Sequence, residues 1–246
     1  MFDAGTSPVK RAGVPVAPPK AGSATTLIVI AVILAAVVGS LPFGSLALYP
    51  FSLFVTLIHE TGHAVAAVLT GGSVNSLTLA SNLSGVTWTS GGIEALIAPA
   101  GYLGATLVGV ALLLLPVRWS RAVLGTLALI PLAALLLFNA GNVFTTLWCV
   151  GFFVVLVLAA WRLSPRITAF LQIFLGVEAG LNAFRDLLTL LLISGSGAHM
   201  QTDATNMSHA LFLPPIVWAV SWTVISLLLL IAALAAVIRR DIRQLR

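Results

Sequence analysis

Residues 53–72, LFVTLIHETGHAVAAVLTGG, place two histidines and a glutamate in an apolar run long enough for a membrane helix. On a helix, His59 and His63 are four residues apart and face the same way, so their imidazoles converge on one point. Neutral imidazole is a good zinc ligand. Glu60 is offset around the helix, where it can act as a general base without binding the metal. A chance pattern, or a polar contact that packs helices, would not explain why half of the four histidines and an intramembrane acid lie together. The stretch therefore predicts a zinc (Zn²⁺) site.

The composition restricts the class of protein. Of 246 residues, 59% are hydrophobic and 8% are charged, whereas soluble domains carry roughly 25% charged residues. These values exclude a soluble enzyme, a nucleic-acid binder and a disordered chain, and they indicate a multi-pass membrane protein, expected in the cell membrane. The net charge of +5 does not indicate a nucleic-acid partner, because most basic residues lie at the ends of apolar segments, as membrane-flanking anchors do. Eight of the twelve are Arg118, Arg121, Arg162, Arg166, Arg239, Arg240, Arg243 and Arg246.

The apolar segments predict an all-α membrane protein with six or seven transmembrane helices, since a spanning helix needs about 20 apolar residues. The candidate spans are 25–44, 47–69, 93–115, 122–139, 142–162, 167–193 and 213–238. The fourth and fifth share one apolar stretch, which is broken at Asn139–Asn142. Residues 1–22 form a polar tail that we expect to be flexible, and residues 23–246 form one membrane-embedded domain.

The connection between residues 71 and 92 is unusual for a helical membrane protein. Its sequence, GGSVNSLTLASNLSGVTWTSGG, interleaves Val, Leu and Trp with Ser, Thr and Asn, and it has turn residues at 82–85. This alternation predicts a short β-hairpin directly after the helix that carries the two histidines.

Several motifs resemble those of the site-2 protease family of intramembrane zinc metallopeptidases, in particular its small multi-pass branch without a PDZ domain. They are HETGHA at residue 59, Gly71-Gly72, the stretch Asn182–Leu188, Asp203-Ala204 and Leu213–Trp218. The resemblance implies that the domain is a metallopeptidase, with His59 and His63 as zinc ligands, Glu60 as catalytic base and an aspartate from a later helix as third ligand. Well-known members carry that aspartate in a Leu-Asp-Gly motif, which is absent here.

The third ligand therefore has to be argued from the residues. Glu178, Asn182 and Asp186 recur every four residues and form a polar stripe on one helix face. Asp186 and His63 are at similar distances from the ends of helices that run in the same direction, so we choose Asp186. Asp203 is the second choice, because an aspartate among Ser, Thr and Asn is more often a turn or cap residue. Glu178 and Asp186 are about 12 Å apart along the helix and cannot bind one metal ion together.

These observations predict an intramembrane zinc endopeptidase that acts on membrane proteins, most simply on a single substrate helix in the lipid bilayer. Such a helix must unwind before attack, because its carbonyls are hydrogen-bonded, and the edge of the hairpin can hold the extended segment. A membrane protein that binds or transports metal ions, and an inactive scaffold of the same fold, remain alternatives.

The orientation in the membrane stays open. If seven spans cross, the tail, the hairpin and the loop 194–212 lie on one side and the arginines on the other. The positive-inside rule then puts the arginines and the C-terminus in the cytoplasm and the side of the hairpin away from it. The resemblance implies the opposite, a site near the cytoplasm.

Overall fold

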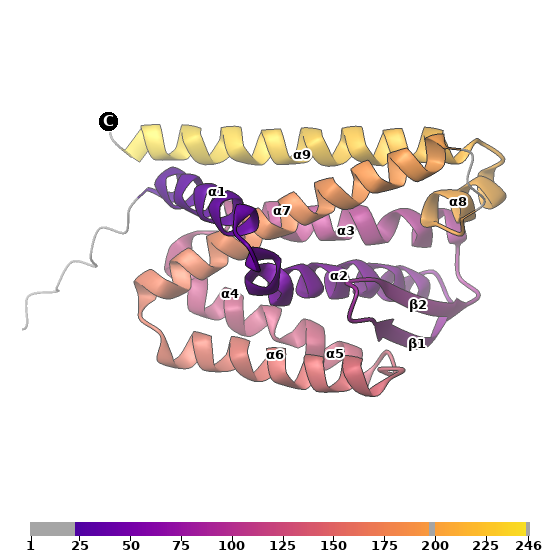
Figure 1. The fold of residues 1–246 in the computed structure, drawn as a ribbon, viewed down its shortest axis with the longest axis horizontal. Helices are drawn as coiled ribbons and strands as arrows, with labels where there is room; N and C mark the ends of the chain where they lie inside the picture. The colour runs from indigo at the N-terminus through magenta and orange to yellow at the C-terminus, as the bar shows by residue number, and fades with distance from the viewer. Residues whose placement is uncertain (1–22, 197–199, 245–246) are drawn as a thin grey trace, which may run out of the picture.

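The computed structural model describes residues 23–196 and 200–244, and its architecture is a bundle of apolar helices with one small sheet (Figure 1). The helices of the first half are α1 (Ala24–Ser40), α2 (Gly44–Leu69), α3 (Glu94–Leu114), the 3₁₀ turn η1 (Val117–Trp119), α4 (Ser120–Leu127) and α5 (Leu129–Leu136). Those of the second half are α6 (Val143–Arg162), α7 (Pro165–Gly195), α8 (Asp203–Leu211) and α9 (Pro215–Gln244). The strands are β1 (Ser73–Leu79) and β2 (Gly85–Ser90). The tail at residues 1–22, expected to be flexible, lies outside the described residues.

The prediction of an all-α multi-pass membrane protein with a hairpin after the histidine helix is confirmed. Within the described residues, six segments are long and apolar enough to cross a membrane: α2, α3, η1–α5, α6, α7 and α9. Asn142 caps α6 by accepting a hydrogen bond from the Thr145 N–H at 2.7 Å, which explains why the shared apolar stretch breaks there. α1 is also apolar but has 17 residues, and it is shorter than these six segments.

The two ends of the described chain meet at the same end of the bundle. Asp241 near the end of α9 accepts hydrogen bonds from the backbone N–H and the hydroxyl of Thr25, at 2.8 and 2.7 Å. Figure 1 shows α1 beginning beside the end of α9, while α2 ends at the opposite end, next to the hairpin and α8. α1 and α2 together therefore traverse the bundle once. The arrangement with seven crossings, in which the start of the first helix lies on the hairpin side, is wrong.

The hairpin folds back along α2. β1 and β2 pair antiparallel, and Leu83 in the turn has a positive φ of 70°. The Tyr49 hydroxyl of α2 donates to the Ser81 carbonyl at 3.0 Å, and that of Thr56 donates to the Leu83 carbonyl at 3.0 Å. Because these partners belong to the first half of α2, the non-helical backbone lies at the depth of the helices rather than beyond their ends.

The outer edge of β1 is covered by the junction between α5 and α6. The N–H of Leu77 donates to the Asn139 carbonyl at 3.2 Å, and the N–H of Gly141 donates to the Leu77 carbonyl at 3.0 Å. The Asn139 and Asn142 side chains donate to the carbonyls of Asn75 and Leu79, at 2.9 and 3.1 Å. Backbone groups at membrane depth need such partners. Among the described residues nothing pairs with the other edge of β2.

Helices α2 and α3 pack closely because small residues meet between them. A Cβ atom on Gly62 would overlap the Ala100 carbonyl oxygen, and one on Gly104 would lie 3.7 Å from the Gly62 Cα. Small residues allow membrane helices to approach until their backbones touch. This contact brings the start of α3 against the histidines of α2.

Candidate metal centre

Helix α2 presents its two histidines on one face, as their spacing predicts. The Nε2 atoms of His59 and His63 are 2.9 Å apart, and both side chains are mostly buried. Nδ1 of His63 lies 2.8 Å from the Ile97 carbonyl oxygen of α3. A carbonyl only accepts hydrogen bonds, so Nδ1 carries the proton and Nε2 of His63 points its lone pair at the cluster. This is the tautomer that a metal ligand needs.

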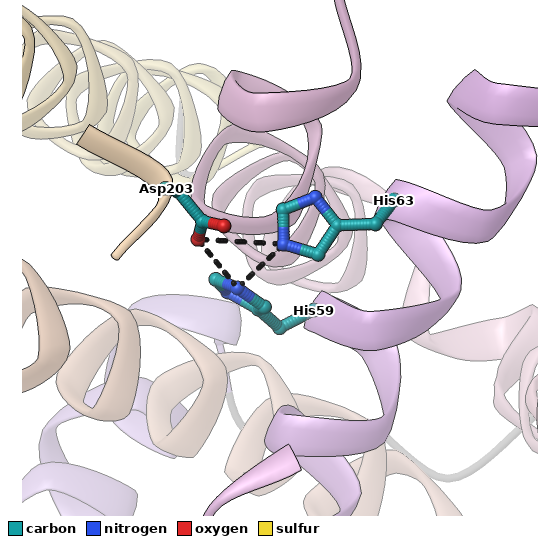
Figure 2. Close-up of side chains that lie close together, drawn as sticks. All are labelled: His59, His63 and Asp203. Atoms are coloured by element: carbon teal, nitrogen blue, oxygen red, sulfur yellow. Dashed lines mark hydrogen bonds and ion pairs between the residues drawn. The ribbon is translucent and has the colours of Figure 1, made fainter. Parts of the chain in front are cut away.

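A carboxylate from α8 completes the cluster (Figure 2). Oδ2 of Asp203 lies 3.3 Å from Nε2 of His59 and 3.4 Å from Nε2 of His63. Asp203 is the first residue of α8, and the cap residue is Thr202, which forms a capping box with Thr205. Burial opposes the charge of Asp203, but the neighbouring imidazoles of His63 and His59, when protonated, outweigh it and hold the pKa of Asp203 well below its usual range.

The three ligand atoms suit a metal ion. Two imidazole nitrogens and one carboxylate oxygen lie within 4.8 Å of one another. At zinc–ligand distances of about 2.0–2.1 Å, tetrahedral geometry puts ligand atoms about 3.3 Å apart, close to the separations of Oδ2 from the two nitrogens. Two imidazoles and a carboxylate are also a donor set that catalytic zinc sites use.

Space for an ion depends on Gly101 in α3. A Cβ atom on this residue would lie closer than 3.0 Å to the Nε2 atoms of both His59 and His63. Sequence reasoning did not single out this position. The feature that could have indicated Gly101 is its place within an apolar helix, because glycine is unfavourable there unless another group must approach closely.

The Glu60 carboxylate is held by strand β2. Glu60 is only 5% exposed. The Thr87 hydroxyl donates to Oε2 at 2.7 Å and also lies 3.0 Å from the Glu60 carbonyl oxygen. Gly85 leaves room for the carboxylate, since a Cβ atom there would lie 2.6 Å from Oε1. The sequence predicted the hairpin but not that it would touch Glu60.

The polar stripe of α7 lies beside the cluster rather than in it. Asp186 lines the same cleft as the histidines, but within the described residues the metal-binding group contains Asp203 and not Asp186. Asn182 donates to Oε2 of Glu178 at 3.0 Å and to the Glu178 carbonyl at 2.8 Å, and Glu178 is fully buried. Asp186 does line the same cleft as the two histidines. Within residues 194–212, which were expected to be a loop, Asp203–Leu211 form the short helix α8, and this helix brings Asp203 to the histidines.

These residues surround a cleft of about 570 Å³. Its walls come from α2, strand β2, the start of α3, the last turns of α7 and the start of α8. Residues 85–89 of β2 are among the lining residues, so the strand with the free edge faces the cluster. Four carboxylates line the cleft, those of Glu60, Glu94, Asp186 and Asp203.

Comparison with known proteins agrees with the motif of His59, Glu60 and His63 on α2. The model of the Peptidase M50B-like family matches residues 26–233, which is most of the chain. The chain belongs to this family. The resemblance to site-2 proteases is thus confirmed, and membership in M50 makes the protein a multi-pass member of a family of intramembrane metallopeptidases. No curated protein and no solved structure matches the chain significantly.

The role of Gly101 can be tested by adding one methyl group. In Gly101→Ala the new Cβ would occupy space at both Nε2 atoms, so we expect the zinc content of the purified protein to fall by about tenfold or more. Gly104→Ala, one turn further along α3, meets only an ordinary contact at 3.7 Å and should keep its zinc. Elemental analysis of both variants measures this, and unchanged zinc in Gly101→Ala would contradict the assignment.

The two aspartates can be separated by matched substitutions. Asp203→Asn removes the anionic oxygen beside both imidazoles, so zinc affinity at fixed pH should fall by roughly 10–100-fold or more. Asp186→Asn makes the same change on α7 and should leave affinity nearly unchanged. Competition with a chromogenic chelator measures both values. A larger loss for Asp186→Asn would return the third ligand to α7.

Proposed function

We propose that this protein is a zinc endopeptidase that hydrolyses peptide bonds of membrane-embedded or membrane-proximal protein substrates. The observation that carries the proposal is the grouping of His59, His63 and Asp203 in one cleft with the buried Glu60, whose carboxylate is hydrogen-bonded to Thr87 and is not in the metal-binding group. Two imidazoles and a carboxylate would hold the metal and leave a fourth position for the reacting groups.

The metal and the glutamate have separate tasks. A zinc ion bound by these residues supplies a Lewis acid that activates water at neutral pH and polarises the scissile carbonyl. Glu60 accepts the proton of the attacking water and later delivers it to the leaving amine. The Thr87 hydroxyl, 2.7 Å from Oε2, restrains the carboxylate in the orientation that this transfer requires.

The open edge of β2 offers a place for the substrate. A transmembrane helix hides its carbonyls in its own hydrogen bonds, so the segment to be cut must become extended. An extended segment can add to a free strand edge through backbone hydrogen bonds. Because residues 85–89 line the cleft and the other side of the sheet is covered by Asn139–Gly141, we place the substrate along β2. A single-span membrane protein is the substrate that fits this geometry most simply.

Substituting the proposed base tests the proposal. Glu60→Gln removes the proton acceptor but no ligand, so it should keep its zinc and lose cleavage of a membrane peptide by about 10²-fold or more. Glu94→Gln makes the same change on another carboxylate that lines the cleft and should retain cleavage. If wild type binds one zinc but cleaves none of the membrane peptides tested, that result favours the inactive scaffold. Near-normal cleavage by Glu60→Gln would exclude Glu60 as the base.

The contact between Thr87 and Glu60 gives a second test. Thr87→Val keeps the shape of the side chain but removes the donor, and a hydrogen bond to a charged group contributes about 1.5–3 kcal/mol. We therefore expect kcat to fall by about tenfold or more, with KM and zinc content nearly unchanged. Thr87→Ser restores a hydroxyl and should recover most of kcat. If the loss lies in KM alone, Thr87 acts on substrate binding rather than on Glu60.

A further inference from the structure

Tyr102 of α3 packs between two other rings beside the metal cluster. It meets the His59 ring edge-to-face, with the two ring centroids 4.5 Å apart and the planes at 87°. The ring of Trp222 in α9 is stacked on Tyr102 with a centroid distance of 5.8 Å, and Trp222 is only 3% exposed. Tyr102 also directly follows Gly101, the residue that leaves space beside both Nε2 atoms. Packing therefore holds the Tyr102 ring in place next to a candidate metal ligand.

The hydroxyl of Tyr102 is not used by the fold. Among the described residues it has no hydrogen-bond partner, and it is not one of the side-chain atoms that are buried without a partner. Because Tyr102 lines the cleft, its hydroxyl is accessible from there. By contrast, the hydroxyls of Thr56, Thr87 and Thr189, which line the same cleft, already donate to carbonyl or carboxylate oxygens.

The hydrolysis proposed above needs a hydrogen-bond donor in this cleft. When water adds to the scissile carbonyl, the carbon becomes tetrahedral and the carbonyl oxygen gains a negative charge. Four carboxylates line the cleft and repel such a charge, and three of them, those of Asp203, Asp186 and Glu60, act electrostatically on Tyr102. A neutral tyrosine hydroxyl is a donor. Donors that are fixed in place before the reaction stabilise an oxyanion without having to reorganise.

We propose that Tyr102 is a further catalytic residue, whose hydroxyl donates a hydrogen bond to the oxygen of the scissile carbonyl as negative charge develops there. This inference rests on the proposed function. The phenol keeps its proton throughout: Glu60 takes the proton of the attacking water and passes it to the leaving amine as the C–N bond breaks. Because the carbonyl oxygen is neutral in the bound substrate and anionic after water has added, the hydrogen bond strengthens towards the transition state. It therefore raises kcat more than it raises affinity for the substrate.

Tyr102→Phe separates the hydroxyl from the ring. Phenylalanine keeps the ring contacts with His59 and Trp222, so the zinc content should be unchanged. We expect kcat for a membrane peptide to fall by about tenfold to 100-fold, with KM nearly the same. Tyr49→Phe is the matched control and should retain most of kcat, since it removes the hydroxyl of the chain's other tyrosine, which does not line the cleft.

A binding measurement tests the same contact without turnover. Two fluorescent peptides of alternating Leu and Ala are compared: one is intact, and the other has a phosphinate in place of its central peptide bond, which mimics the tetrahedral anion. Both are titrated with zinc-loaded protein that carries Glu60→Gln, so that neither peptide is cut. Adding Tyr102→Phe should weaken binding of the phosphinate peptide by about tenfold or more and leave binding of the intact peptide nearly unchanged.

The other outcomes would overturn the proposal. Equal losses for the two peptides would make Tyr102 a substrate-binding residue, and a loss of zinc would make it a positioning residue for His59. Unchanged affinity for both peptides, or a phosphinate peptide that does not bind at all, would exclude the hydrogen bond. A protein that binds the phosphinate peptide through Tyr102 but cleaves none of the membrane peptides tested counts against the proposed function alone, so the two failures are distinguishable.

Discussion

Two imidazole nitrogens 2.9 Å apart in the apolar interior of a helix bundle need a shared electrophile or a shared proton, because two facing lone pairs repel each other. The His63 tautomer is fixed by Ile97, so the proton cannot simply move to the ring's other nitrogen. A cation between the nitrogens would meet this need, and the surrounding structure suits one. Gly101 of α3 leaves space beside both nitrogens, and the Asp203 carboxylate of α8 adds a negative charge that would stabilise the cation. The close contact of α2 with α3, which small residues allow, and the packing of α8 on the bundle bring these groups together around the pair.

A sheet at membrane depth is the second constraint on the fold. Backbone groups there must find partners within the protein or line a cavity. Asn139, Asn142 and Thr145 satisfy the outer edge of β1. The free edge of the sheet, on β2, borders the cleft, where water or an extended peptide can form hydrogen bonds with it. The break between α5 and α6 therefore has two roles: it reverses the direction of the chain, and it supplies hydrogen-bond partners to the sheet.

The sequence was sufficient for features encoded by neighbouring residues. The spacing of His59 and His63 determines that they converge, and alternation over residues 71–92 predicts the hairpin. Contacts between distant segments were harder to predict. Asp203 reaches the cluster only because α8 folds back, and Gly101 matters only because α3 crosses α2 at that level. Likewise, hydropathy could not reveal that α1 and α2 together cross the bundle only once, since that depends on the contact between Thr25 and Asp241.

The origin of Asp203 in a short helix has a thermodynamic consequence. α8 is attached to the bundle by Ala204 and Met207, which pack against residues of α3, α7 and α9. If Asp203 binds the metal, the docking of α8 and the binding of the ion are linked: the free energy by which docking favours the ion equals the free energy by which the ion favours docking. A substitution of Met207 that undocks α8 would then weaken the binding of the ion, although Met207 is not itself in the metal-binding group. The affinity of the metal centre for its ion thus depends on apolar packing around α8 as well as on the ligands themselves.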